Sequence, residues 1–234
     1  MTKDAERTRA YTESELAPQR ERRWRVVVFQ AYLIAALALF AFLAVLARSA
    51  AYFPIDLVIT QALQAYGWPW FDLLMRIVSW PGYGPQVLGV IAVLSSLLWV
   101  LGLHREALVS ALDGLAALLS NNLIKLAIAR PRPSPDLVDV IKEVSGFSFP
   151  SGHVMFYTAY FGFLFFLSYT MLKPSWKRTL LLLLFGALVV LVGPSRIYLG
   201  NHWASDVFAA YLLGSLILAG AIRVYTRWDA KQKG

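Results

Sequence analysis

The chain has 234 residues, of which 58% are hydrophobic and only 15% are charged. A soluble domain carries charge on about 25% of its residues, so this composition excludes an ordinary soluble fold and indicates a membrane protein. The formal net charge of +8 would suit a nucleic-acid binder, but the basic residues gather at the ends of apolar runs, where they orient a chain in a bilayer. We therefore expect the lipid bilayer, and no nucleic acid, as a partner. Because the chain has no cysteine, disulfides and thiolate metal sites are excluded.

About 20 apolar residues span the hydrocarbon core of a membrane, and six segments qualify. The predicted fold is therefore all-α, a six-transmembrane-helix bundle that forms one domain over residues 26–225. The first apolar run is longer than the core of a signal peptide, which indicates an uncleaved signal-anchor. The predicted spans are Val26–Ala47, Tyr83–Leu103, Ala107–Ala129, Val154–Leu172, Thr179–Leu199 and Trp203–Val224.

Lysine and arginine in short loops predict how the bundle is oriented, because they favour the cytoplasmic face. Six spans place the basic segment 1–25, the turn at Arg105, the loop 173–178 and the tail 226–234 on one face, which is then cytoplasmic. We therefore expect both termini in the cytoplasm. The opposite, extracytoplasmic face receives the cations of three motifs, which run against the rule and so have another task.

The segment between the first two spans, residues 48–82, is too polar to cross a membrane. Its pattern predicts one or two amphipathic helices, broken at Gly67-Trp68-Pro69, that lie at the outer interface and line a lipid access route. A plain connecting loop is the alternative interpretation.

A Pro-Ser-Gly-His sequence, Pro150–His153, stands where an outer loop becomes the fourth span. Ser151 can cap this helix, and the first-turn N–H groups of Ser151, Gly152 and His153 have no partner within the helix. Unpaired amides at a helix start attract anions. The sequence therefore predicts an anion site here.

His202 and Asp206 are four residues apart at the start of the sixth span, a spacing that places them on one helical face. A carboxylate bonded to one imidazole nitrogen fixes the tautomer and leaves the other nitrogen as a nucleophile or base. Arg196 ends the fifth span and can reach across the short turn. We predict that these three side chains act together.

Lys125 lies near the outer end of the third span, and Arg132 follows in a proline-rich loop. A guanidinium binds two phosphate oxygens at once, and an ammonium supplies a point charge. Together with Arg196, these cations predict a pocket for a phosphate group. Arg130 has two interpretations, phosphate binding or contact with lipid head groups.

Four further polar residues lie in or beside the third span. His104 falls on the cytoplasmic face, so we assign it no catalytic role. Asp113 is costly within a membrane, and we expect it to hydrogen-bond between helices. Asn121 shares a face with Lys125 and is expected to orient its ammonium, while Asn122 is expected to bond to a neighbouring helix.

The three motifs, Lys-X6-Arg-Pro, Pro-Ser-Gly-His and Ser-Arg-X5-His-X3-Asp, resemble the three-part signature of the type 2 phosphatidic acid phosphatase superfamily, without a departure. The resemblance implies that His202, oriented by Asp206, attacks phosphorus and forms a phosphohistidine, while His153 protonates the leaving group. It also implies that no metal or other cofactor is needed. The implied phosphate ligands are Lys125, Arg132, Ser151, Gly152 and Arg196.

The sequence thus predicts an integral membrane phosphatase that acts on a lipid phosphate or diphosphate from the extracytoplasmic face of a bacterial cytoplasmic membrane. Isoprenyl diphosphates such as undecaprenyl diphosphate, phosphatidylglycerophosphate and phosphatidate all fit. One alternative is a lipid phosphotransferase that passes the phosphoryl group to an acceptor lipid. Another is a non-enzymatic transporter or scaffold whose cations stabilise lipid head groups.

Overall fold

The computed structural model describes the backbone of residues 3–232 and the side chains of residues 23–228. Its regular elements are helices, which confirms the all-α prediction. In chain order they are α1 (Lys3–Ser49), α2 (Pro54–Gln64), α3 (Pro69–Ser79), the 3₁₀ turn η1 (Trp80–Gly82), α4 (Gly84–Val100), α5 (His104–Ile128), α6 (Gly152–Phe156), the π-helical turn η2 (Tyr157–Phe161), α7 (Gly162–Met171), α8 (Trp176–Tyr198) and α9 (Ala204–Gln232).

The chain divides into two compact units, Met1–Ala38 and Leu39–Gly234. The first unit consists of the N-terminal part of α1. The predicted cytoplasmic segments 1–25 and 226–234 fall largely on residues whose side chains lie outside the described part of the chain. The contacts reported below all belong to the second unit.

Five helices of the described chain are long and apolar enough to cross a membrane, and a bent pair supplies a sixth crossing if its two helices count as one span. The five agree with the first and the third to sixth predicted spans. The second predicted span, Tyr83–Leu103, corresponds to α4, which has only 17 residues. The preceding helical segment, Pro69–Gly82, meets α4 at 69°. This bend places the turn at Gly82 and Tyr83 beside the site described below.

The segment before this bend forms two helices, α2 and α3, separated by residues 65–68, as predicted for an amphipathic segment. One face of α3 is buried and includes Met75 and Ser79, each at most 1% exposed. Trp68, Trp70 and Trp80 are exposed in and around α3, as suits the interface of a membrane. The alternative of a plain connecting loop is therefore wrong.

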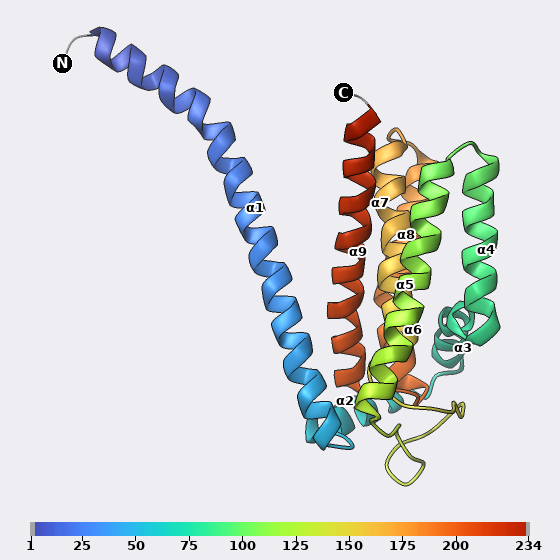
Figure 1. Cartoon of the computed structure of the whole chain (residues 1–234). Helices are drawn as coiled ribbons and strands as arrows, with labels where there is room; N and C mark the ends of the chain where they lie inside the picture. Colours follow the sequence, from blue (N-terminus) through green and yellow to red (C-terminus); the bar gives the residue numbers. More distant parts are fainter. Residues whose placement is uncertain (1–2, 233–234) are drawn as a thin grey trace. The chain divides into compact units, whose positions relative to one another are not determined.

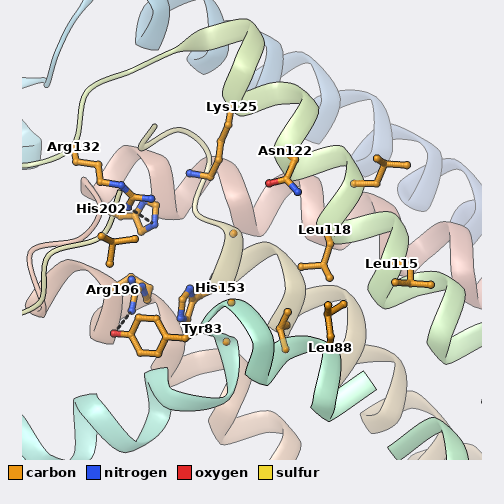
Figure 2. Close-up of a pocket in the computed structure, with 16 residues that line it drawn as sticks. Tyr83, Leu88, Leu115, Leu118, Asn122, Lys125, Arg132, His153, Arg196 and His202 are labelled. Atoms are coloured by element: carbon orange, nitrogen blue, oxygen red, sulfur yellow. Dashed lines mark hydrogen bonds between the residues drawn. The ribbon is translucent and has the colours of Figure 1, made fainter. Parts of the chain in front are cut away.

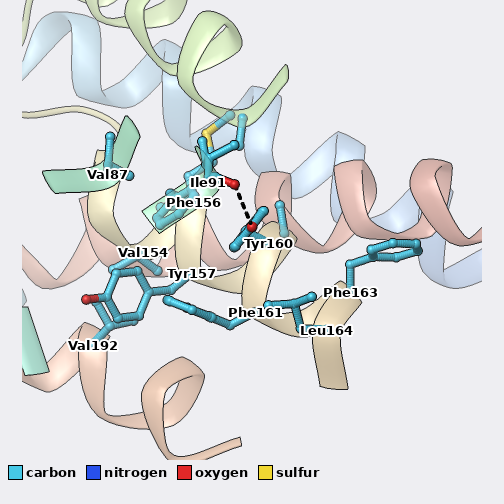
Figure 3. Close-up of a cluster of buried hydrophobic side chains, with 14 of the residues drawn as sticks. Val87, Ile91, Val154, Phe156, Tyr157, Tyr160, Phe161, Phe163, Leu164 and Val192 are labelled. Atoms are coloured by element: carbon cyan, nitrogen blue, oxygen red, sulfur yellow. Dashed lines mark hydrogen bonds between the residues drawn. The ribbon is translucent and has the colours of Figure 1, made fainter. Parts of the chain in front are cut away.

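The hydrophobic core surrounds the span formed by α6, η2 and α7, whose aromatic side chains interlock (Figure 3). Phe156 and Tyr160 stack with ring centroids 5.2 Å apart. The Tyr157 hydroxyl donates a hydrogen bond of 2.6 Å to the carbonyl oxygen of Val78, which fixes α3 against this span. Close packing of this kind leaves the start of α6, including His153, little freedom to move.

The second unit has two distinct ends (Figure 1). The turns between α4 and α5 and between α7 and α8, together with the C-terminal end of α9, lie at one end. The long loop after α5, the start of α6 and the turn between α8 and α9 lie at the other. The antiparallel helices therefore bring all three motifs to the same end.

Asp113 does not make the predicted hydrogen bond between helices. It is only 4% exposed within α5, and neither carboxylate oxygen has a hydrogen-bond partner among the described residues. The polar contact between α4 and α5 is made instead by Ser95 and Ser110, whose hydroxyl oxygens lie 3.2 Å apart.

Candidate functional site

The loop after α5 folds back over the end of the bundle. Helix α5 ends at Ile128, and the left-handed φ of 55° at the next residue, Ala129, turns the chain away from the helix axis. The loop is closed by a hydrogen bond of 2.8 Å from the Ser148 amide to the Arg130 carbonyl. Lys125, in the last turn of α5, donates to the carbonyl oxygens of Phe147 and Ser148. These contacts bring Lys125 and Ser148 to the turn that carries His202.

His202 lies in the turn between α8 and α9 and is only 2% exposed. Its Nε2 atom is 3.2 Å from Nη1 of Arg132 (Figure 2). Its Nδ1 atom is 3.4 Å from Oγ of Ser148. A guanidinium can only donate hydrogen bonds, so Nε2 accepts and Nδ1 carries the proton. The lone pair of Nε2 thus faces the cationic side of the site, where it accepts a hydrogen bond from Arg132.

The surroundings of His202 favour its neutral form. Burial lowers the pKa of His202 well below its ordinary value, and the charges of Arg132, Lys125 and Arg196 lower it further. A hydrogen bond with the backbone of Ser148 opposes this shift but is the smallest of these effects. At neutral pH the imidazole is therefore uncharged, as a nucleophile requires.

Arg132 is itself anchored by backbone carbonyls. Nη1 donates to the oxygen of Asn201 at 2.7 Å, and Nε donates to the oxygen of Gly146 at 3.0 Å. Burial, followed by repulsion from Arg196, lowers the pKa of Arg132 to about 10, so the side chain stays charged at neutral pH.

Asp206 contacts His202 through a third residue. Its Oδ2 atom is 3.8 Å from Nδ1 of His202, too far for a hydrogen bond. The Ser148 hydroxyl stands between them and donates to Oδ2 at 2.5 Å, while the amide of Trp203 donates to the same oxygen at 2.9 Å. The prediction that the two residues share a helical face is wrong, because α9 begins at Ala204 and His202 precedes it.

His153 faces the same cavity from the start of α6. Its ring meets the Tyr83 ring edge-on with centroids 4.7 Å apart, and it hydrogen-bonds to the backbone of Ser79. A Cβ atom on Gly82 would lie 2.3 Å from Cδ2 of His153, so the close approach of this turn requires glycine. The Nε2 atom is buried and has no hydrogen-bond partner in the described part of the chain. This nitrogen is available to a ligand.

Arg196 projects from the last turn of α8 and is fully buried. Its Nη1 atom donates to the Ser79 hydroxyl at 2.8 Å and to the Tyr83 hydroxyl at 3.0 Å. Nε and Nη2 have no partner among the side chains and backbone that the structure describes. Buried donors without partners are costly, and an anion would satisfy both.

These side chains line one cavity of about 650 Å³ with two chemically different parts (Figure 2). The histidines and cations gather at one end, and leucines of α4 and α5, including Leu88, Leu115 and Leu118, line the other. Six predicted site residues line it, namely Lys125, Arg132, Gly152, His153, Arg196 and His202. The cavity can therefore hold an anionic group joined to an apolar chain.

The Pro-Ser-Gly-His motif differs from the prediction in detail. Ser151 precedes α6 as expected, but its side chain makes no capping bond, and its Oγ has no partner within the described residues. Its amide is not free, since it donates to the Asp206 carbonyl at 3.2 Å. A Cβ on Gly152 would lie 2.9 Å from Oδ1 of Asn121. Asn121 binds the Pro150 carbonyl at 3.0 Å instead of orienting the Lys125 ammonium, so that prediction is wrong.

Two other polar residues also have contacts that were not predicted. Arg130 is fully buried and binds Asp56 and Asp206, so neither interpretation offered for it is correct. Asn122 lines the cavity, although it was expected to bond to a neighbouring helix. His104 starts α5, whose opposite end carries the site, in agreement with its exclusion from the catalytic residues.

Three side chains of the site were not found by sequence reasoning. Ser79 and Tyr83 orient Arg196, and Ser148 joins His202 to Asp206. Each is separated from its partner by more than 50 positions in the sequence. The only local signal is the glycine on either side of Tyr83, which indicates a turn but not its neighbours.

No group of three or more His, Cys, Asp or Glu side chains arranged to hold a metal ion occurs among the described residues. Metal independence stays a prediction.

Comparison with known proteins gives concordant results. The model of the PAP2 superfamily matches residues 107–230. Phosphatidylglycerophosphatase B of Bacillus subtilis (strain 168) is 29% identical over 166 residues, which cover 69% of this chain and 79% of that protein. Undecaprenyl-diphosphatase BcrC of the same organism is 32% identical over 127 residues, which cover 52% of this chain and 58% of that protein.

A solved structure is also similar. The crystal structure of a transmembrane PAP2 type phosphatidylglycerolphosphate phosphatase from Bacillus subtilis superposes with a TM-score of 0.69 at 26% identity. The match covers 85% of this chain and 96% of that one. It extends well beyond residues 107–230, so the fold similarity includes helices that precede the signature.

Proposed function

Because the chain belongs to the PAP2 superfamily, we propose that it is a membrane phosphatase that hydrolyses a lipid phosphate or diphosphate through a phosphohistidine on His202. The observation that carries this proposal is a single cavity in which His202, His153 and three cations share one end and leucines line the other. Such a cavity suits a phosphate group attached to a hydrocarbon chain.

In the first step, Nε2 of His202 attacks phosphorus while the bond from phosphorus to the leaving oxygen breaks. His153 gives its Nε2 proton to that oxygen, which leaves as an alcohol or as a lipid phosphate. Lys125, Arg132 and Arg196 hold the phosphoryl oxygens as charge shifts in the transition state. Ser151 and Gly152 also bind the phosphoryl oxygens at the start of α6, where the Ser151 hydroxyl, which has no partner among the described residues, is the available donor.

In the second step, water attacks the phosphohistidine and inorganic phosphate leaves. His153, now neutral, takes a proton from the attacking water, and the bond between Nε2 of His202 and phosphorus breaks. The cycle returns both histidines to their starting protonation states and needs no cofactor.

The substrate class follows from the apolar end of the cavity, and the names of the relatives narrow it. One relative is named for phosphatidylglycerophosphate and the other for undecaprenyl diphosphate. Both lipids, and phosphatidate, place a terminal phosphate at head-group depth. We propose this class as the substrate.

The location of the site is part of the same proposal. Arg105 and the cationic loop 173–178 lie at the end of the second unit opposite the motifs. The preference of such loops for the cytoplasm supports an extracytoplasmic site in a bacterial cytoplasmic membrane, with both termini cytoplasmic.

The test is phosphate release by the full chain in detergent from phosphatidate, phosphatidylglycerophosphate and undecaprenyl diphosphate. His202→Ala serves as the blank and His104→Gln as the matched control, since it changes a histidine at the other end of the bundle. We expect release by wild type and by His104→Gln on at least one lipid. Equal release by wild type and blank on every lipid would contradict the proposal. Turnover that starts only when an acceptor lipid is added would indicate a phosphotransferase instead.

The pH dependence of kcat/KM is expected to be bell-shaped. As pH falls through the pKa of His202, the nucleophile is protonated and the rate drops; because that pKa is lowered, this acid limb lies below about pH 6.5. A bound phosphate favours the charged form of His153, and as pH rises His153 loses the proton that it donates, so the rate drops again.

Arg132→Gln tests the origin of the acid limb. This change removes a charge that lowers the pKa of His202, so the limb should move to higher pH. Rates are measured in detergent from about pH 5 to 9, with chemistry shown to limit kcat/KM. A flat wild-type profile would refute the assignment of the two histidines.

Gly82→Ala is expected to lower kcat by at least about tenfold, because a Cβ at this position would displace the His153 ring. Gly89→Ala in α4 is the matched control, since nothing lies within 4 Å of its added Cβ. Initial rates at saturating lipid phosphate check the result. Equal rates for both variants would show that the turn at Gly82 does not position His153.

A further inference from the structure

A buried ion network joins α2 to the turn that carries His202. Arg130 donates to Oδ2 of Asp56 through Nη2 at 2.9 Å and to Oδ1 of Asp206 through Nη1 at 2.6 Å. All three side chains are fully buried. We call these three residues the buried charge network.

The network is tightly fixed at its α2 end. Asp56 accepts hydrogen bonds from the amide and the hydroxyl of Ser205, both at 2.8 Å, and from the Phe53 amide at 2.9 Å. The Phe53 ring also covers the Arg130 guanidinium, whose carbon lies 4.7 Å from the ring centroid. Because every charged group has partners and water is excluded, the network cannot easily rearrange when the charge on His202 changes.

The charges in the network do not cancel. Two carboxylates share one guanidinium, so the network carries one net negative charge. Hydrogen bonds connect this charge to His202: Asp206 accepts from the Ser148 hydroxyl, whose oxygen contacts Nδ1 of His202. It stands on the side of the imidazole opposite Nε2, where it stabilises the positive charge that the ring gains as Nε2 bonds to phosphorus.

Without Asp56, the charge of Asp206 would be cancelled by Arg130, its nearest cation. We therefore propose that Asp56 and Arg130 are positioning residues that set the negative charge which Asp206 presents to His202. The proposal rests on the proposed phosphohistidine function and assigns Arg130 no contact with substrate. It also gives α2, which lies outside the three motifs, a part in the chemistry of the site.

The first test is Asp56→Asn, which keeps the shape of the side chain and removes its charge. We expect kcat for phosphatidylglycerophosphate to fall roughly 10–100-fold, the range typical when the outer hydrogen-bond partner of a metal-ligating histidine is removed, with little change in KM. Thr60→Val is the matched control on α2, because among the described residues the Thr60 hydroxyl bonds only to the Asp56 backbone. A wild-type kcat in a folded Asp56→Asn would overturn the proposal.

The double variant Asp56→Asn with Arg130→Gln separates charge from structure. It restores one net negative charge, and glutamine can still donate a hydrogen bond to Asp206. We expect it to be more active than either single variant. If the double variant is folded but no better than the worse single variant, the role of the network is structural and the proposal fails. This comparison with Arg130→Gln also decides the question if Asp56→Asn alone does not fold.

A chemical modification experiment tests the proposal without measuring lipid hydrolysis. Diethyl pyrocarbonate acylates neutral imidazole, and mass spectrometry of the full-length protein follows each histidine separately. Asp56→Asn should slow acylation of His202 but not of His104. Unchanged acylation of His202 would overturn the proposal even in an active enzyme, whereas failure of the proposed function would show only as absent phosphate release by wild type.

Discussion

His202→Ala is expected to lower phosphate release by at least about a thousandfold, because it removes the atom that we propose bonds to phosphorus. Nε2 of His202 is the only imidazole nitrogen of the site in contact with a cation of the described chain, Arg132 at 3.2 Å. Phosphate release from a lipid phosphate in detergent, with protein folding checked by thermal unfolding, measures the loss.

His153→Gln provides the contrast that separates the two histidines. It removes the proton donor but leaves the nucleophile, so it should slow release of a poor leaving group far more than release of p-nitrophenolate, which needs no proton. With p-nitrophenyl phosphate, His153→Gln is expected to accumulate acid-labile phosphoenzyme, and His202→Ala is expected to form none. Phosphoenzyme in His202→Ala, or equal losses on both substrates in the two variants, would contradict the assigned roles.

The sequence predicted which residues line the cavity better than it predicted the contacts that hold them in place. Lys125, Arg132, His153, Arg196 and His202 converge on one cavity, as their motifs indicated. Their spacing carries this information because each motif stands at a helix end, and antiparallel helices bring alternate ends together. The helices themselves follow from apolar runs whose length matches a bilayer.

The supporting residues left no such pattern. Ser148 lies in an irregular loop, and its position between His202 and Asp206 depends on the left-handed turn at Ala129. The sequence does not predict this turn, because the position is not a glycine. The spacing of His202 and Asp206 predicts a shared helical face, but α9 begins only after His202.

Arg130 shows why the chemistry of a residue type can mislead. An arginine close to Arg132, which is predicted to bind phosphate, suggests a second anion ligand. Its partners in the structure are Asp206 and Asp56. Asp56 belongs to the segment 48–82, for which the sequence predicted only a place at the membrane interface. The spacing of residues within a motif does not predict such a contact, because the partners lie 74 and 76 positions away in the sequence.

Arg196→Lys is expected to lower kcat/KM roughly 100- to 1,000-fold, the loss typical when a donor to transition-state charge is removed. The reason is geometric. Nη1 is occupied by Ser79 and Tyr83, while Nε and Nη2, which form the opposite edge of the guanidinium, have no partner within the described chain. That edge matches two phosphoryl oxygens, and an ammonium cannot reproduce it while also bonding to Ser79 and Tyr83. Initial rates on a lipid phosphate and the inhibition constant of orthovanadate measure the loss.

The control for this prediction is the same exchange at an exposed arginine. Arg76 pairs with Asp72 on α3, half exposed to its surroundings, so Arg76→Lys should change the rate by no more than about twofold. Compared with wild type, orthovanadate should bind much more weakly to Arg196→Lys but equally well to Arg76→Lys. The reason is that orthovanadate resembles the phosphoryl group in the transition state and not the lipid. If Arg196→Lys binds orthovanadate as tightly as wild type and loses only thermal stability, then Arg196 serves to join α8 to Ser79 and Tyr83. The phosphoryl group would in that case be held by Lys125 and Arg132 alone, and the unpaired edge of the guanidinium would need another ligand.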